Sequence, residues 1–161
     1  TSAVTDAFAV PATLSVINTI PSSSAVRTRT FEISNAMEHH GYPMNDGMKM
    51  RHRINGKLYE SSRIDENVAA NTNEIWVFNN SKGDEPHPMH LHGVFFRVLQ
   101  RTGGRGNLIA SESGWKDTVL VMPGETVSIL VPFENNPGKF VFHCHNLEHE
   151  DDGMMLQYQL S

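Results

Sequence analysis

Two short segments contain most of the side chains that could bind a transition metal. Residues 140–154 include the single cysteine of the chain and close on a methionine, Met154. Residues 86–93 form the second segment, with the sequence Pro-His-Pro-Met-His-Leu-His-Gly. Six of the nine histidines lie in these segments, at positions 87, 90, 92, 143, 145 and 149. Thiolate and imidazole are ligands of copper and zinc, so this concentration predicts a metal site.

The segment around the cysteine is predicted to be extended. Residues 140–142 are aromatic and β-branched, which indicates a strand over residues 138–144. Successive side chains of a strand point to opposite faces. Cys144 therefore faces one side of the strand, whereas His143 and His145 face the other. This alternation predicts two metal centres that lie back to back.

The spacing after the cysteine indicates which ligands share its metal. Cys144, His149 and Met154 follow one another at equal steps of five, and a polar loop would bring the last two back to the sulfur. His87 is the natural second imidazole. One cysteine, two histidines and a weak axial methionine are the ligands of a blue-copper electron-transfer site. Zinc is the chemical rival, but a thioether ligand favours copper.

The remaining histidines fall into two groups. His90 and His92 are two positions apart, so on an extended segment they share a face and can join the second centre. His39, His40 and His52, taken singly, are interpreted as ordinary surface or core histidines.

The two motifs together resemble a known family. His-Pro-Met-His-Leu-His-Gly at 87–93 and His-Cys-His-Asn-Leu-Glu-His-Glu-Asp-Asp-Gly-Met-Met at 143–155 are similar to the paired copper motifs of multicopper oxidases. The similarity is to the C-terminal, third cupredoxin domain of laccases and cuprous oxidases. Segments 54–59 and 114–119 also resemble that domain, and the likeness covers roughly residues 10–161. It implies an all-β fold, a Greek-key cupredoxin β-barrel or sandwich.

The resemblance also implies a role for each motif residue. The ligands of the type 1 copper would be His87, Cys144, His149 and Met154. Those of a trinuclear copper site would be His90 for its type 2 copper and, for its type 3 pair, His92, His143 and His145. In the family the other four of eight histidines come from the first domain. Glu150 matches a proton-relay position, and Asp117 is a candidate for orienting a ligand histidine.

These roles imply a function that the chain shares with other domains. The whole enzyme would take single electrons from phenols, amines or metal ions and reduce O2 to water. The chain alone would carry one type 1 copper and be inactive without its partner domain, whether that domain belongs to the same gene, a separate chain or a second copy. Two alternatives remain open: a stand-alone blue-copper electron carrier, and a copper-binding or storage module built on residues 37–52.

Composition excludes other classes. The net charge of −5 argues against a nucleic-acid-binding protein, which needs a basic face. No apolar run approaches the roughly 20 residues of a membrane span. Residues 1–10 lack the basic start and apolar centre of a signal peptide. Family resemblance nevertheless implies an extracytoplasmic location, either periplasmic or secreted.

The predicted organisation is one domain of short strands separated by turns. Residues 1–12 would be a linker or N-terminal arm and residues 13–161 the cupredoxin domain. Residues 35–53 would be a loop insert that carries Met37, Met44, Met48 and Met50. This insert is either a flexible cap or a soft-metal and substrate-approach segment. We expect strands near residues 13–20, 27–34, 74–79, 94–101, 117–121, 126–133, 138–144 and 155–160.

Overall fold

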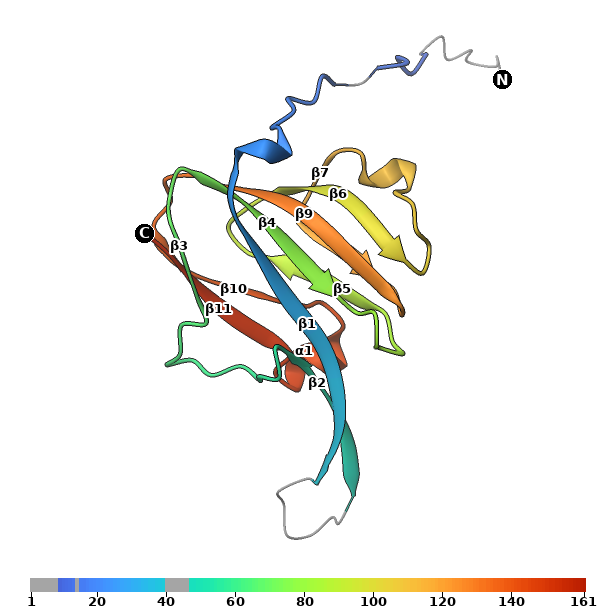
Figure 1. Ribbon diagram of the computed structural model, residues 1–161, viewed down its shortest axis with the longest axis vertical. Coiled ribbons are helices and arrows are strands. Elements are labelled where there is room, and N and C mark those ends of the chain that lie inside the picture. Colours follow the sequence, from blue (N-terminus) through green and yellow to red (C-terminus); the bar gives the residue numbers. More distant parts are fainter. Residues whose placement is uncertain (1–8, 14, 40–46) are drawn as a thin grey trace, which may run out of the picture.

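The fold is a sandwich of two β-sheets, shown in the computed structural model of Figure 1, which describes residues 9–13, 15–39 and 47–161. The larger sheet has the order β2-β1-β4-β9-β6-β7, formed by Met48–Ile54, Ala25–His39, Thr72–Asn79, Glu125–Phe133, Phe96–Gly103 and Trp115–Lys116. The smaller sheet has the order β3-β11-β10-β5-β8, formed by Glu66–Val68, Met155–Leu160, Gly138–Cys144, His87–Leu91 and Thr118–Val121. The prediction of an all-β sandwich is confirmed.

Helical structure in the described residues is limited to short turns. These are η1 (Ser22–Ser24), η2 (Ala110–Glu112) and α1 (Leu147–Asp151). None of these described segments has the length and apolar character that a helix needs to cross a bilayer.

Strand alternation builds an aromatic core between the sheets. Trp76 and Phe78 point inward from β4, Phe31 from β1 and Phe142 from β10, and all four are fully buried. The ring centroids of Phe31 and Trp76 lie 4.8 Å apart, and those of Trp76 and Phe142 lie 5.0 Å apart. The core therefore extends to Phe142, two residues before the cysteine.

The expected first strand is absent from the described residues. Residues 15–20 form no strand, and Val16 is 86% exposed; the first strand, β1, begins at Ala25. The prediction of a strand over residues 13–20 was therefore wrong for the described part of that range. β-Propensity reflects how well a side chain fits a half-buried sheet, and it supplies no pairing partner by itself.

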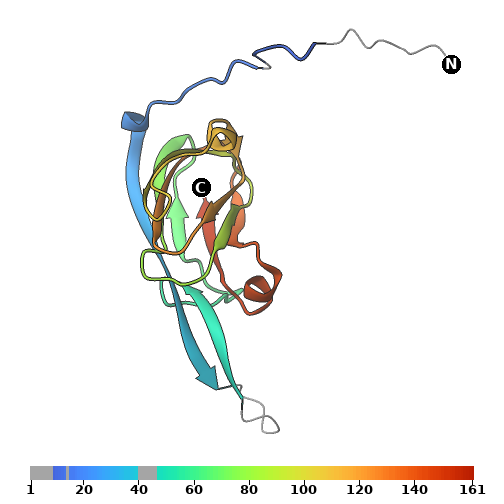
Figure 2. The same ribbon diagram turned by 90° about the vertical axis from the view of Figure 1, so that its right-hand side faces the viewer.

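A long hairpin arm replaces most of the predicted loop insert. β1 and β2 pair antiparallel, in a register that runs from Ile33↔Ile54 to His39↔Met48. The two strands continue beyond the sandwich as a ribbon (Figures 1 and 2). The loop prediction was wrong for residues 35–39 and 48–53, because backbone pairing forms a strand there although the residues of the ribbon are mostly polar and few are buried. Residues 40–46, with Met44 and His40, lie outside the described residues.

One end of the smaller sheet brings the two histidine motifs together. β10 pairs with β5 antiparallel, so that His143 lies opposite His90 and Cys144 opposite Met89. The chain then enters α1, and β11 returns beside β10. The two motifs are thus adjacent through backbone hydrogen bonding.

Candidate metal centres

The first centre forms around the sulfur of Cys144, at the end of β10. Cys144 points into the sandwich and is fully buried. His87 points to the same side from the first position of β5, and its Nδ1 lies 3.6 Å from Cys144 Sγ. His149 Nδ1 lies 3.5 Å from the same sulfur. The structure therefore brings together a thiol and two imidazoles from separate segments.

A short helix returns the chain to the cysteine. The Asn146 side chain caps α1 by accepting a hydrogen bond from the backbone N–H of Glu148, at 3.2 Å. One helical turn then places His149 over Cys144. Gly153 continues the turn with a positive φ of 88°, and Met154 O accepts a hydrogen bond from Cys144 N at 3.1 Å. Met154 is fully buried beside the cysteine backbone, so the five-residue spacing corresponds to a helix and a turn where a polar loop was expected.

The arrangement fits a metal ion. An ion bonded to sulfur at about 2.3 Å and to nitrogen at about 2.0–2.1 Å, with trigonal or tetrahedral angles, places these ligand atoms about 3.5–3.8 Å apart. Burial lowers the pKa of His87 to about 3, which keeps its imidazole neutral and available as a ligand. Burial also raises the pKa of the Cys144 thiol to about 11, so a bound cation must displace its proton.

A third imidazole, from His52, lies against this centre and was missed in the sequence. His52 points inward from β2 and is 4% exposed. Its ring centroid lies 3.8 Å from that of His149 and 5.3 Å from that of His87. Burial, with the neighbouring imidazole of His149, lowers the pKa of His52. The one available signal was that His52 lies two positions before the core residue Ile54, on the same face of a strand.

The carboxylate of Glu85 lies next to the imidazoles of His52 and His149. Its Oε2 lies 3.1 Å from His149 Nε2 and 3.4 Å from His52 Nε2. His52 Nε2 is buried and makes no hydrogen bond within the described structure. Because the Glu85 carboxylate accepts a hydrogen bond, His149 Nε2 carries the proton, and its Nδ1 lone pair is left facing Cys144.

The second cluster lies on the opposite face of β10. His92 Nε2 and His143 Nε2 are 3.1 Å apart, and the His90 ring centroid lies 4.8 Å from His92, 5.4 Å from His143 and 5.6 Å from His145. The structure therefore confirms the predicted alternation, in which Cys144 faces one side of β10 and its neighbouring histidines face the other. Burial lowers the pKa of His92 and His143. This side is more open, because the His145 side chain is 54% exposed.

Backbone contacts orient the imidazoles of this outer cluster. His143 Nδ1 lies 3.1 Å from the carbonyl oxygen of Cys144, which leaves Nε2 directed toward His92. His90 Nδ1 lies 2.9 Å from the main-chain carbonyl of Asp117. The contact that the structure shows for Asp117 therefore runs through its backbone. Glu150 Oε2 lies 3.4 Å from His143 Nδ1 and 4.0 Å from His145 Nδ1.

A cavity of about 350 Å³ opens beside the first centre. It is lined by Lys49, Met50, His52, Glu85, Asn146, Glu148, His149 and Asp152. Three of these side chains are carboxylates, and the one lysine forms an ion pair with Asp152. Met50 thus reaches the site, whereas Met37 and Met48 are about half exposed on the arm.

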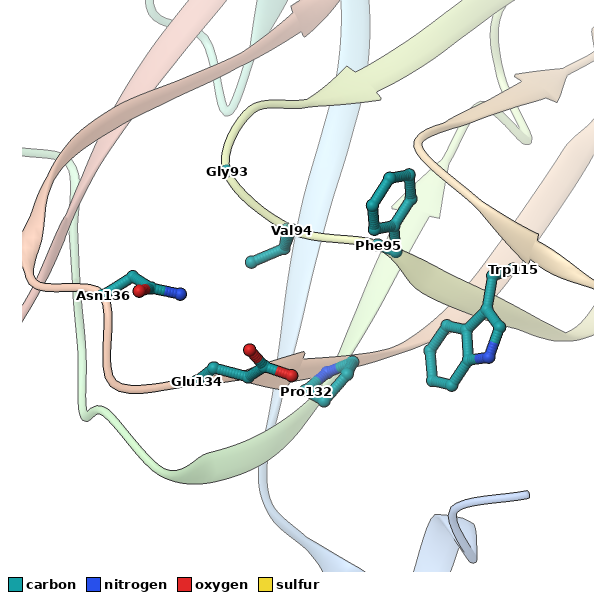
Figure 3. Close-up of a pocket in the computed structure, with 7 residues that line it drawn as sticks. All are labelled: Gly93, Val94, Phe95, Trp115, Pro132, Glu134 and Asn136. Carbon is teal, nitrogen blue, oxygen red and sulfur yellow. The ribbon is translucent and has the colours of Figure 1, made fainter. Parts of the chain in front are cut away.

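A larger cavity of about 570 Å³ is lined by residues that start at Gly93, which follows His92 in the sequence. In Figure 3, Trp115 and Asn136 lie at opposite ends of the cavity, with Val94 and Glu134 between them. Phe95, which is 64% exposed, adds a second aromatic ring to this surface.

Comparison with known proteins identifies the family. The family model described as "Multicopper oxidase" matches residues 27–161. The chain belongs to the multicopper oxidase family. It is 39% identical over 119 residues to the multicopper oxidase mco of Staphylococcus haemolyticus, covering 72% of this chain and 26% of that protein. It is 34% identical over 144 residues to a Bacillus subtilis laccase, covering 79% of this chain and 26% of the laccase.

Solved structures give the same result for the fold. A Pediococcus acidilactici laccase superposes with a TM-score of 0.79 at 33% identity, covering 97% of this chain and 31% of the laccase. A Campylobacter jejuni multicopper oxidase described as a metallo-oxidase has a TM-score of 0.79 at 26% identity, covering 96% of this chain and 34% of that structure. The fold is thus the cupredoxin fold of this family, and copper is the metal that the family implies. The chain spans about a quarter to a third of the length of these relatives.

Proposed function

We propose that this chain is the C-terminal, third cupredoxin domain of a laccase-like oxidase and that it carries the type 1 copper of that enzyme. One observation carries the proposal. The Cys144 sulfur lies 3.5–3.6 Å from two imidazole nitrogens, while the flanking histidines join a separate cluster on the other face of the strand. Family membership supports copper as the metal, and the relatives named laccase support the reaction type.

The chain's residues divide the work between the two faces. Bound copper would supply one-electron redox chemistry at the inner centre. Cys144, His87 and His149 would hold it, and Met154 would be a weaker fourth ligand. The covalent path from Cys144 to His143 and His145 links this centre to the outer cluster. It is supplemented by the 3.1 Å contact between His143 Nδ1 and the Cys144 carbonyl.

The outer cluster is proposed as half of the site that reduces O2 to water. His90 would serve the type 2 copper, and His92, His143 and His145 the type 3 pair. The four other histidines would come from a partner domain, which is encoded by the same gene, belongs to a separate chain or is a second copy of this domain. Glu150, within 4.0 Å of two of these rings, is placed to carry protons toward them.

The cavity beside His149 is proposed as the place where the reductant approaches. It suits small phenols or metal ions, because it measures about 350 Å³ and is lined mostly by polar side chains. Met50 lines this cavity, which supports the substrate-approach interpretation of the methionines for that residue. The domain is proposed to comprise residues 13–161, with residues 1–12 as a linker, in an extracytoplasmic enzyme.

A stand-alone blue-copper electron carrier is the second candidate, supported by the inner centre taken alone. Such a carrier needs no cluster of imidazoles on the far face of its cysteine strand. His90, His92 and His143 form such a cluster, with ligand atoms close enough to hold one ion. The outer cluster therefore favours the oxidase over the carrier.

The test begins with the copper-loaded chain. We expect an intense blue sulfur-to-copper charge-transfer absorption and about one tightly bound copper per chain. Cys144→Ser should abolish the colour, whereas the matched variant His90→Ala should keep it, because His90 belongs to the outer cluster. A colourless wild-type chain, or a blue Cys144→Ser variant, would contradict the assignment.

A second measurement separates the oxidase from the carrier. Oxygen-dependent oxidation of a phenolic dye should be near zero for the chain alone and should appear when the remaining domains are supplied. If added partner domains leave activity at zero while the chain still exchanges electrons with small redox mediators, the carrier interpretation is correct.

A further inference from the structure

Two side chains that the proposed function does not use lie directly against one ligand of the inner centre. The His52 ring packs against that of His149 in a tilted arrangement, with centroids 3.8 Å apart and an interplanar angle of 31°. Glu85 Oε2 lies close to the Nε2 atoms of both rings, 3.1 Å from that of His149 and 3.4 Å from that of His52. His52 comes from β2 and Glu85 from the segment before β5, so three separate parts of the chain meet at His149.

Packing alone does not account for a histidine at position 52. The alternation of β2 places it on the inward face with Ile54, where an apolar side chain would fill the space. His52 instead buries a ring nitrogen that makes no hydrogen bond within the described residues, which destabilises a fold. Buried unpaired polar atoms are rare enough in native structures to require an explanation.

The contacts of His149 supply that explanation. Hydrogen bonding of its Nε2–H to Glu85 sets the tautomer and directs Nδ1 toward the Cys144 sulfur. The tilted ring of His52 lies against the imidazole of His149 and restricts its rotation. Resting on the proposed function, we propose that His52 is a positioning residue for the inner copper site, acting on His149 through the packed ring, beside the Glu85 carboxylate that holds His149 Nε2.

The strand that carries His52 is also linked to residues 149–154, the segment that carries His149 and Met154. Lys49, three residues earlier in β2, forms an ion pair with Asp152, which lies between His149 and Met154. Beyond the end of β2, Tyr59 N donates a hydrogen bond to Gly153 O at 2.8 Å. The base of the hairpin arm therefore holds both the ligand ring and the turn that follows it.

This placement also covers the outer edge of the ligand. The His149 side chain is 7% exposed, whereas that of Glu85 is 45% exposed. His149 and Glu85 both line the 350 Å³ cavity, so a reductant there contacts the exposed Glu85 carboxylate beside the small exposed edge of His149.

The test uses five variants of the copper-loaded chain: His52→Leu, His52→Gln, Glu85→Ala, the double variant His52→Leu/Glu85→Ala and the control Arg51→Leu. Arg51 adjoins His52 in β2 and faces the opposite way, so the control makes a matched change on the same strand. The readouts are copper affinity by chelator competition, the copper hyperfine coupling in the EPR spectrum and the charge-transfer band. The melting temperature of each metal-free variant is measured alongside them.

We expect Glu85→Ala to weaken copper binding about 10–100-fold and His52→Leu about 10-fold, both with a changed hyperfine coupling. The double variant should lose less than the product of the single losses, because both residues act through one ring. Arg51→Leu should stay within about 2-fold of wild type. His52→Gln, which keeps a donor but loses the ring, should fall between wild type and His52→Leu.

The proposal and the function on which it rests fail in different ways. A wild-type chain without the blue absorption would overturn the proposed function. A blue wild type, with His52→Leu and His52→Gln both matching its affinity and EPR spectrum, would overturn only the role of His52, whatever their melting temperatures. Losses that simply multiply in the double variant would overturn the shared action through His149.

Discussion

The two faces of β10 carry centres of opposite character. The inner face holds Cys144 with two buried imidazoles, His87 and His149, enclosed by the core, α1 and the base of the hairpin arm. On the outer face, His143 is buried but His145 is largely exposed, and their ring centroids lie 5.4 Å apart. Under the proposed function, the inner centre would have its full ligand set within this chain, whereas the more open outer cluster would need further ligands from a partner domain.

The segment that leads to His87 on the inner face is also held in place by hydrogen bonds. Asn80 donates a hydrogen bond from its side chain to the Glu85 carbonyl at 2.8 Å, and from its backbone to the Glu125 carbonyl at 2.8 Å. The buried Glu125 carboxylate pairs with Arg101 and Arg105. The segment leading to His87 is therefore anchored to a buried ion cluster.

The largest effect on stability is expected when substitutions at two adjacent positions of β10, one facing inward and one outward, are compared. Phe142 points inward, is fully buried and packs against Phe31 and Trp76, whereas Val141 points outward. Phe142→Ala should lower the free energy of unfolding by about 3–5 kcal/mol, through lost burial and a cavity. Val141→Ala should cost about 1 kcal/mol or less. Denaturant unfolding of the metal-free chain measures both values, and equal losses would refute the contrast between the two faces.

The elements that depend on local periodicity were predictable from the sequence. The opposite orientations of His143 and Cys144 follow from the two-residue period of any strand, and the strands around residues 74–79 and 126–133 follow from their short runs of β-branched and aromatic residues. The five-residue steps to His149 and Met154 indicated a return to the sulfur. They did not reveal α1, because a five-residue helix is too short to show a helical period.

The features that sequence reasoning missed depend on long-range packing. The contacts of His52 could not be predicted from the sequence, because they form only where β2 packs beside His149, and its neighbours Glu85 and His149 are distant in sequence. The ribbon formed by residues 25–39 and 48–54 was hidden because both its faces are wet beyond the sandwich. Residues 13–20 show the opposite error, in which β-prone residues were expected to form a strand that the described part lacks.

The next effect concerns acid stability behind the inner centre. Hydrogen bonding to Arg105 holds the pKa of Glu125 at about 2, below its ordinary value of 4.5. A lowered folded-state pKa contributes stability above pH 4.5 that is lost as the pH falls toward 2. The difference of 4.5 − 2 corresponds to about 3 kcal/mol. Unfolding free energies measured between pH 6 and pH 3 should fall steeply for wild type and less steeply for Glu125→Gln.

The control for this prediction is Glu134→Gln. Glu134 is exposed at the end of β9, so its loss should leave the pH slope of wild type unchanged. An identical slope in Glu125→Gln and wild type would show that other carboxylates govern acid unfolding.

The smallest effect should come from the outer face. His145 is 54% exposed and its nearest charged neighbour, Glu150, lies 4.0 Å away, so little stability depends on its side chain. His145→Ala should change the unfolding free energy of the metal-free chain by about 0.5 kcal/mol or less and should keep the blue absorption. The same variant should abolish oxygen reduction once the partner domains are present, because the open cluster would then lose a ligand at the shared site. A large loss of stability in the isolated chain would instead mean that His145 supports the fold, and the outer face would no longer be an open half-site.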